Sequence, residues 1–221
     1  MAFFFSPLPQ SGDTPLLFLP GWGFDARLLH LFKLYHGKTL ILPDSFVDPS
    51  CFEEELLLFL HKEKVGKMAI VGWSMGAQLG LGFAAAHPGR IAALDLVAMR
   101  GSWPRQDIEV IKEGLSRDFR GFMSEFYRKC FLGYRAAYKE FTLALQDDYL
   151  QKNDRKKLVA GLDYLRHFRL PPSLPAGIPV KIIHGRKDVV APVSNMARLP
   201  GAACEIMPHS GHMVLLDMEI S

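Results

Sequence analysis

The sequence predicts an α/β fold: a mostly parallel central sheet with helices on both faces and an inserted helical cap. Three observations lead to this prediction. Short apolar strand-like runs alternate with helix-like runs along most of the 221 residues, which is typical of parallel sheets crossed by helices. Gly72-Trp73-Ser74-Met75-Gly76 joins one such strand to one such helix. A serine, an aspartate and a histidine then follow strand-like runs in that chain order.

The predicted strands are the apolar runs of the alternating part, and the predicted helices fill the segments between them. Because strands joined by a crossover helix run parallel, the loops that follow them should meet at one edge of the sheet. Strands are expected at residues 16–19, 39–42, 68–71, 91–99, 180–183 and 203–207, with an edge strand at residues 3–7. Helices are expected near residues 26–34, 52–63, 76–87 and 193–199.

Residues 106–168 depart from this alternation, because amphipathic helix-like segments follow one another there with no strand between them. An insertion at the carboxyl edge of an open α/β sheet stands over the crevice in which such folds bind ligands. We therefore expect a core of residues 1–104 and 170–221 and a cap of residues 105–169 that covers Ser74. The cap helices are expected near residues 108–114, 119–131, 136–145 and 155–168.

The segment Gly72-Trp73-Ser74-Met75-Gly76 has the pattern of a nucleophile elbow. In a Gly-x-Ser-x-Gly elbow the serine occupies a sharp, strained turn between strand and helix, so the positions two before and two after it must be nearly free of side chain. Gly72 and Gly76 meet that need. Ser74 is therefore the candidate nucleophile.

A serine hydroxyl needs a base within hydrogen-bond reach and a third group that orients the base. Asp188 and His212 follow the two last predicted strands and fit those roles. His209 competes with His212 on the same loop, but His212 follows a glycine and opens an apolar helical start. Asp95 is a poorer acid because it falls inside a strand, and His184 is expected to be a satisfied histidine at the sheet edge.

Acyl transfer also requires donors aimed at the developing oxyanion. One candidate is the backbone N–H of Met75, directly after the nucleophile. The other is the backbone N–H of Trp22, on the loop after the first core strand, where Gly21 and Gly23 allow the backbone to turn inward. Packing in a pocket is a compatible role for the Trp22 side chain.

Composition excludes several classes of protein. A hydrophobic content of 49% and a charged content of 22% are typical of a soluble globular protein with one core. Residues 68–86 carry no charge and are long enough to be read as a membrane span, but their four glycines favour a buried strand, turn and helix. The sequence offers no paired His/Cys spacing and no phosphate loop, so we expect no metal and no cofactor. A cytoplasmic location is expected, because the first twenty residues lack a signal-peptide pattern.

The net charge of +3 is concentrated in the cap. Residues 101–170 hold 14 Lys and Arg against 10 Asp and Glu, which gives +4 and leaves −1 for the rest of the chain. Such a surface could steer an acidic macromolecular partner, or it could be an ordinary solvated helix surface. Nucleic-acid binding is disfavoured because the excess is small and no known module is recognisable. The basic residues considered are Arg117, Arg120, Arg128, Lys129 and Arg135, with Lys139, Arg155, Lys156 and Lys157 nearby.

Taken together, these motifs resemble the α/β-hydrolase superfamily over essentially the whole chain. The residues that carry the resemblance are Leu19-Pro20-Gly21-Trp22-Gly23, Gly72-Trp73-Ser74-Met75-Gly76, Gly185-Arg186-Lys187-Asp188 and Ser210-Gly211-His212. More narrowly, the chain is similar to the biotin-pathway carboxylesterases, the pimeloyl-[acyl-carrier protein] methyl ester esterases. That similarity rests on Gly21-Trp22-Gly23, on Trp73 directly before the nucleophile and on Trp103-Pro104-Arg105 at the start of the cap.

The resemblance implies an α/β-hydrolase fold whose cap is inserted after the sixth core strand. It also implies a serine carboxylesterase that hydrolyses the methyl ester of a carrier-bound pimeloyl chain in biotin biosynthesis, through an acyl-enzyme on Ser74. Trp22 and the basic cap residues named above would then contact substrate and the acyl-carrier protein. A small-ester hydrolase, a thioesterase or a menaquinone-pathway lyase of the same fold are alternatives, as is a hydrolase-shaped binding protein. A monomer that does not bind membranes is expected.

Overall fold

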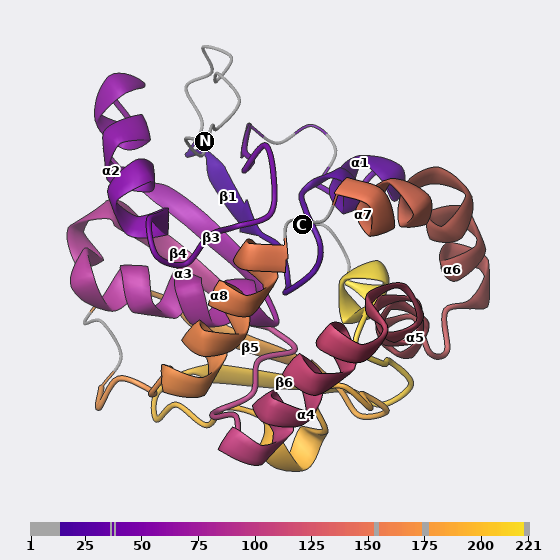
Figure 1. Ribbon diagram of the computed structural model, residues 1–221. Coiled ribbons are helices and arrows are strands. Elements are labelled where there is room, and N and C mark those ends of the chain that lie inside the picture. Colours follow the sequence, from indigo (N-terminus) through magenta and orange to yellow (C-terminus); the bar gives the residue numbers. More distant parts are fainter. Residues whose placement is uncertain (1–13, 36, 38, 153–154, 174–176, 219–221) are drawn as a thin grey trace.

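A six-stranded parallel sheet forms the centre of the molecule (Figure 1). The computed structural model describes residues 14–35, 37, 39–152, 155–173 and 177–218. The strand order is β2-β1-β3-β4-β5-β6, and all neighbouring strands run parallel. The predicted fold class is therefore confirmed, while the edge strand expected at residues 3–7 lies outside the described residues. The strands are β1 (Leu16–Leu19), β2 (Leu40–Ile41), β3 (Met68–Trp73), β4 (Ile91–Val97), β5 (Val180–Gly185) and β6 (Ala203–Met207).

Helix α3 (Met75–Ala86) follows the elbow and packs along one face of the sheet, against β1, β3 and β4. Helix α3 is apolar on almost all sides, as expected for a helix that is buried on both the side facing the sheet and the side facing away from it. Helix α2 (Phe52–Lys62) packs on α3, with the Phe52 and Phe83 rings 6.1 Å apart. The uncharged residues 68–86 are thus a strand, a turn and a buried helix, and no helix in the described part of the chain is long and apolar enough to cross a membrane.

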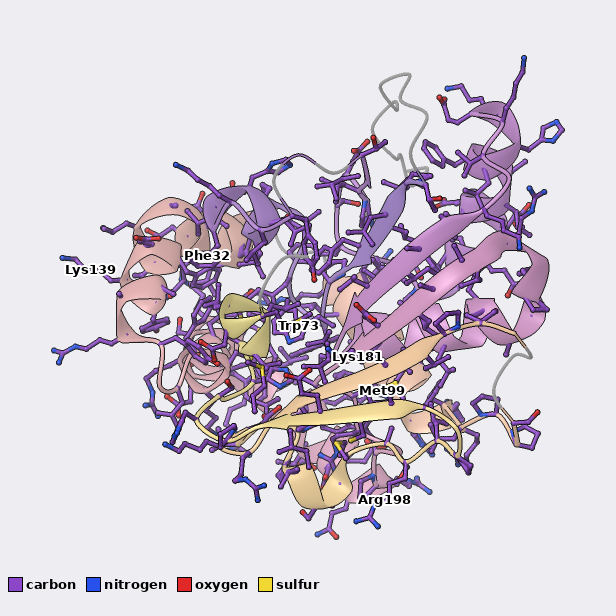
Figure 2. All side chains as sticks on the ribbon, turned by 180° about the vertical axis from the view of Figure 1, so that it is seen from behind. Phe32, Trp73, Met99, Lys139, Lys181 and Arg198 are labelled. Atoms are coloured by element: carbon purple, nitrogen blue, oxygen red, sulfur yellow. The ribbon has the colours of Figure 1, made fainter. Side chains whose placement is uncertain are left out.

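The opposite face of the sheet is more open. Figure 2, seen from behind, has β5 and β6 nearest the viewer, with Lys181 labelled on β5. The side chains of Lys181 and Glu205 are 45% and 48% exposed and form an ion pair of 2.6 Å across β5 and β6. Asp95 sits inside β4 beside Lys181 in the register, as the sequence indicated, and faces this pair. Among the described residues, the face of the sheet that packs against α3 is therefore better covered by helices than the face that carries Lys181 and Glu205.

The cap runs from α4 to α8 and follows β4, the fourth strand in chain order among the described residues (Figure 1). One helix expected near residues 136–145 is in fact interrupted: α6 ends at Phe141, and a π-helical turn, η2, leads into α7. The wider π-helical turn places an extra residue per turn and ends the regular hydrogen-bond ladder. The cap elements are α4 (Arg105–Arg117), α5 (Phe119–Cys130), α6 (Arg135–Phe141), η2 (Thr142–Gln146), α7 (Asp147–Lys152) and α8 (Arg155–His167).

An aromatic cluster joins the cap to the core. Phe24, two residues beyond Trp22 on the core, lies 5.0 Å from the Trp73 ring, 5.1 Å from Tyr127 of α5 and 5.8 Å from Phe141 of α6. Trp73, Tyr127 and Phe141 are fully buried. Rings of this size dominate the apolar area that a core buries, so cap and core share one hydrophobic core.

The helix expected at residues 193–199 is reduced to one 3₁₀ turn, η3 (Val193–Asn195). The chain then becomes extended: Met196 has φ −54° and ψ 139° and bridges to Arg100, and the Ala197 N–H donates to the Met99 carbonyl. Tertiary pairing with the segment after β4 therefore replaces the local helix. Near the other end of the core, α1 is short and covers Arg27–Leu31.

Candidate functional site

Ser74 occupies a strained backbone turn between β3 and α3. Its φ of 57° and ψ of −114° lie outside the regions that a residue with a side chain ordinarily adopts. The surrounding hydrogen bonds hold this conformation: the Ser74 N–H donates to the Val97 carbonyl at 2.8 Å, and the Ser74 carbonyl accepts from Ala77 at 3.1 Å. The side chain is thus presented at the carboxyl end of the sheet, which is the geometry of a nucleophile elbow.

The two glycines of the elbow are required by packing. A Cβ on Gly72 would lie 2.5 Å from the Ala77 Cα, and a Cβ on Gly76 would lie 2.0 Å from the Leu19 carbonyl oxygen. Both obstacles are backbone atoms, which cannot rotate away. Strand and helix can therefore approach this closely only because these two positions carry no side chain.

Asp188 and His212 meet in the structure. The Asp188 Oδ2 atom lies 2.7 Å from His212 Nδ1, and the two side chains are 0% and 2% exposed. The other carboxylate oxygen accepts the backbone N–H groups of Val190 and Ala191 at 2.8 and 2.7 Å. Burial raises the pKa of Asp188, but the charge and hydrogen bond of His212, with help from Ala191, outweigh burial and leave that pKa below its ordinary value. An ionised carboxylate is thereby held against the imidazole.

Trp73, which is labelled in Figure 2, connects this pair to the elbow. The residue directly before Ser74 donates its indole Nε1–H to the His212 carbonyl at 2.9 Å, and its ring centroid lies 5.2 Å from that of His212. Trp73 is fully buried. The end of β3 and the loop after β6 are therefore fixed to each other at the residues next to Ser74 and His212.

The structure separates the histidines that the sequence left in competition. His209 is exposed, whereas His212 is buried against Asp188. His184, expected to be a satisfied residue at the sheet edge, is fully buried within β5 only 3.6 Å from Asp188 Oδ2. Its Nε2 bonds to the Ala191 carbonyl at 2.7 Å, but its Nδ1 has no hydrogen-bond partner among the described residues, so that expectation was only half right. Burial lowers its pKa more than Ala191 and Asp188 raise it, which favours the neutral ring.

The loop that carries Trp22 is fastened to the cap. The Trp22 indole Nε1–H donates to the Leu158 carbonyl of α8 at 2.8 Å. Gly161, one turn further along α8, packs so tightly that a Cβ there would lie 2.7 Å from Trp22 Cδ1 and 3.2 Å from Met75 Sδ. No sequence pattern indicates this bond, because its two ends lie 136 residues apart.

Trp22 and Met75 also border one small cavity of about 10 Å³. Met75 is the first residue of α3, so its N–H belongs to the orphan donors that open a helix. A volume of this size holds about one water molecule. The two candidate oxyanion residues thus border the same small, partly open space beneath α8, with Lys157 and Leu158 of the cap also on its wall.

Arg117, Arg120, Arg128, Lys129 and Arg135 are all exposed, but three of these five have acidic neighbours. Arg128 forms a close pair with Glu125 at 2.7 Å, Lys129 lies 3.9 Å from the same carboxylate, and Arg120 lies 3.8 Å from Asp147. Within the described residues no ion pair is recorded for Arg117 or Arg135. No group of three or more His, Cys, Asp and Glu side chains in the described part of the chain could hold a metal ion.

Comparison with known proteins places this geometry in a family. The chain is 29% identical to the pimeloyl-[acyl-carrier protein] methyl ester esterase of Nitrosomonas europaea over 95% of its own length and 93% of the relative's. It is 27% identical to the protein of the same name from Salmonella agona, covering 91% and 88% of the two chains. The esterase of Exiguobacterium antarcticum superposes with a TM-score of 0.76 at 17% identity, over 93% and 87% of the two chains. The model of the alpha/beta hydrolase family matches residues 16–219. The chain belongs to the alpha/beta hydrolase family.

Proposed function

We propose that this protein is a serine carboxylesterase in which Ser74 is the nucleophile, His212 the base and Asp188 the group that orients it. The observation that carries the proposal is the buried 2.7 Å contact between His212 and Asp188, joined to the strained elbow of Ser74 by the Trp73 hydrogen bond to the His212 carbonyl. A buried ionised carboxylate on Nδ1 favours the tautomer whose Nε2 can accept a proton. The names of the relatives in Nitrosomonas europaea and Salmonella agona support the ester as substrate.

The first half-reaction would form an acyl-enzyme. Ser74 Oγ attacks the ester carbonyl while His212 Nε2 takes the hydroxyl proton, and Asp188 stabilises the imidazolium that results. The backbone N–H groups of Trp22 and Met75 donate to the oxyanion of the tetrahedral intermediate. The intermediate then collapses, the bond to the alkoxide breaks, and His212 returns its proton so that the alcohol leaves neutral.

The second half-reaction would reverse these roles with water. His212 accepts a proton as the water oxygen attacks the acyl carbonyl, and the same two amides hold the oxyanion. Collapse releases the carboxylic acid and returns the proton to Ser74 Oγ. Ester and water are the only reactants that the two steps consume.

We propose as substrate the methyl ester of an acyl chain carried by an acyl-carrier protein, with pimeloyl-[acyl-carrier protein] methyl ester as the specific candidate in biotin biosynthesis. The carrier is acidic, so Arg117 and Arg135 on the cap would attract it, with Arg120, Arg128 and Lys129 less effective because of their acidic neighbours. Long-range attraction of this kind weakens as salt screens it.

The direct test is methanol release from pimeloyl-carrier methyl ester by the purified protein. The wild type should release methanol, and Ser74→Ala should release none above background. Hydrolysis of p-nitrophenyl acetate without hydrolysis of the carrier substrate would reject the substrate and keep the enzyme class. If Ser74→Ala kept both activities, Ser74 would be rejected as the nucleophile.

The carrier partner needs a separate measurement. Arg117→Glu with Arg135→Glu should raise the KM for the carrier-bound ester about tenfold and leave hydrolysis of p-nitrophenyl acetate unchanged. The matched control is Lys62→Glu with Lys67→Glu, which makes the same change of charge beside the amino end of β3, away from the cap. Equal effects of the two charge reversals would mean that only net charge matters and that the cap is no docking surface.

A second candidate function, hydrolysis of small esters, is favoured by one observation. The cavity bordered by Trp22 and Met75 is about 10 Å³, far below the volume of a seven-carbon acyl chain, so a long acyl group would have to bind elsewhere than in this cavity. A short acyl group requires less space. A panel of p-nitrophenyl esters from acetate to octanoate, with matching acyl thioesters, separates the esterase from the thioesterase and gives the preferred chain length.

A further inference from the structure

The loop that carries His212 is held from the cap by a tyrosine that does not touch His212 itself. Tyr134 lies between α5 and α6, after Gly133 at φ +95°. Its hydroxyl accepts the backbone N–H of Gly211 at 3.2 Å and donates to the Asp217 carboxylate. Gly211 directly precedes His212. Asp217 is the last residue of the short 3₁₀ helix η4 (Val214–Asp217), which follows His212. One cap hydroxyl therefore bonds to the chain on both sides of the base.

Ser210 completes the network. Its hydroxyl donates to Asp217 Oδ2 at 2.5 Å. Asp217 Oδ2 therefore accepts hydrogen bonds from two hydroxyl groups, those of Ser210 and Tyr134. Ser210 is 3% exposed, whereas Asp217 is exposed and Tyr134 is half-buried. Burial, together with the adjacent Asp217, raises the pKa of Tyr134 and keeps its hydroxyl protonated. Hydrogen bonds to an ionised acceptor are stronger than neutral ones, so the network resists displacement of the loop.

Packing gives the loop little other freedom at this point. A Cβ on Gly211 would lie 2.7 Å from the Leu132 carbonyl of the cap, and one on Gly185 would lie 2.3 Å from the Gly211 carbonyl. The loop thus passes between the end of β5 and the segment that follows α5. Any movement of that cap segment must move Tyr134, and with it the hydrogen bond to Gly211.

We propose that Tyr134 is a positioning residue: through Gly211 and Asp217 it holds His212 where it can act on Ser74, and it ties the position of the base to that of the cap. The inference rests on the proposed serine esterase mechanism. A base displaced by about 1 Å can cost on the order of a hundredfold in rate, so a hydroxyl that sets its position matters without touching substrate.

Tyr134→Phe tests the proposal because it removes one oxygen and keeps the ring. We expect about tenfold lower kcat on p-nitrophenyl acetate, an equally slower reaction of Ser74 with a fluorophosphonate probe, and a KM within about twofold of wild type. Tyr138→Phe is the matched control, since Tyr138 lies one turn further on, in α6, and packs its ring on Phe131 at 5.7 Å. It should keep wild-type kcat.

Two further measurements separate positioning from a loss of stability. Ser210→Ala combined with Tyr134→Phe should cost less than the product of the two single effects, because both hydroxyls serve the same carboxylate. The downfield proton resonance of His212 Nδ1–H should broaden in Tyr134→Phe at a temperature where the variant is fully folded. Unchanged kcat and an unchanged resonance in a folded Tyr134→Phe variant would overturn the inference. A wild-type protein that the probe does not label would instead overturn the proposed function.

Discussion

Trp73 donates its indole N–H to the carbonyl of His212 at 2.9 Å, so the neighbour of the candidate nucleophile holds the backbone of the candidate base. The bond spans 139 residues and is fully buried. The indole therefore contributes a hydrogen bond as well as packing. A phenyl ring at this position could pack in the core but would leave the His212 carbonyl without its donor.

Trp73→Phe should therefore cost both stability and activity. We expect about 2 kcal/mol of unfolding free energy to be lost, from the cavity and the orphaned His212 carbonyl, and kcat/KM to fall about tenfold. Urea unfolding and ester hydrolysis measure the two effects. Trp103→Phe is the control, because that indole stacks on Arg100 at the start of the cap. If Trp73→Phe kept full activity, the bond to His212 would have no part in positioning the base.

Gly76→Ala should prevent the elbow from forming. The added Cβ would meet the Leu19 carbonyl at 2.0 Å, and neither backbone can move without separating α3 from β1, so we expect a loss of more than about 3 kcal/mol. Gly89→Ala adds the same methyl group where no heavy atom lies within 4 Å and should change stability by less than about 0.5 kcal/mol. Equal stability of the two variants in denaturant titrations would mean that strand and helix do not approach as described.

Much of this site could be predicted from the sequence, because it is written in local patterns. Gly72, Ser74 and Gly76 fall between an apolar strand and an apolar helix, and the order of Ser74, Asp188 and His212 reflects successive parallel strands. The strands themselves were predicted because buried parallel strands are continuous apolar runs, and all six predicted runs within the described residues became strands.

What the sequence did not reveal depends on contacts between distant segments. The bonds from Trp22 to Leu158 and from Tyr134 to Gly211 join the core to the cap, and no periodicity encodes which residues will meet there. The π-helical turn η2 arose inside a segment that resembled one continuous helix, because local propensity does not distinguish the two. The burial of His184 beside Asp188 was missed for a similar reason: the four-residue spacing was visible, but the loop that folds it back was not.

Gly161→Ala should separate catalysis from stability at the contact between α8 and the loop of Trp22, the candidate oxyanion donor. Alanine in a helix interior stabilises by up to about 1 kcal/mol, but here its Cβ would press on Trp22 Cδ1 from 2.7 Å and shift the indole together with its loop. We expect a folded protein whose kcat/KM is about tenfold lower, because the Trp22 amide leaves its place. Gly82→Ala on α3, where the nearest atom is 3.7 Å away, should gain up to about 1 kcal/mol of stability and leave kcat/KM unchanged. Full activity in Gly161→Ala would show that the Trp22 loop can move without cost.

Acidification should destabilise the protein through His184. Burial lowers the pKa of this histidine below its ordinary value of 6.5, so the unfolded chain binds the proton more readily than the folded one. Its contribution is complete above pH 6.5 and is lost as the pH falls toward the lower folded pKa. Asp188, whose pKa is also lowered, adds a second loss only below about pH 4.

His184→Gln keeps a donor for the Ala191 carbonyl and removes the titration. The unfolding free energy of the variant should change less than that of the wild type between pH 7.5 and pH 5.5, as measured by urea titration at each pH. His209→Gln, at an exposed position, should follow the wild-type curve. Parallel curves for wild type and His184→Gln would show that His184 is not the group that titrates.

The central claim is that Ser74 is made nucleophilic by His212 and Asp188, and covalent labelling measures this most directly. The protein is treated with a fluorophosphonate, and the modified peptide is identified by mass spectrometry. One adduct on Ser74 is expected, absent in Ser74→Ala and formed at least about a hundredfold more slowly in His212→Ala, because an unactivated serine hydroxyl does not react. An unlabelled wild-type protein, or a label on any other residue that persists in Ser74→Ala, would contradict the account.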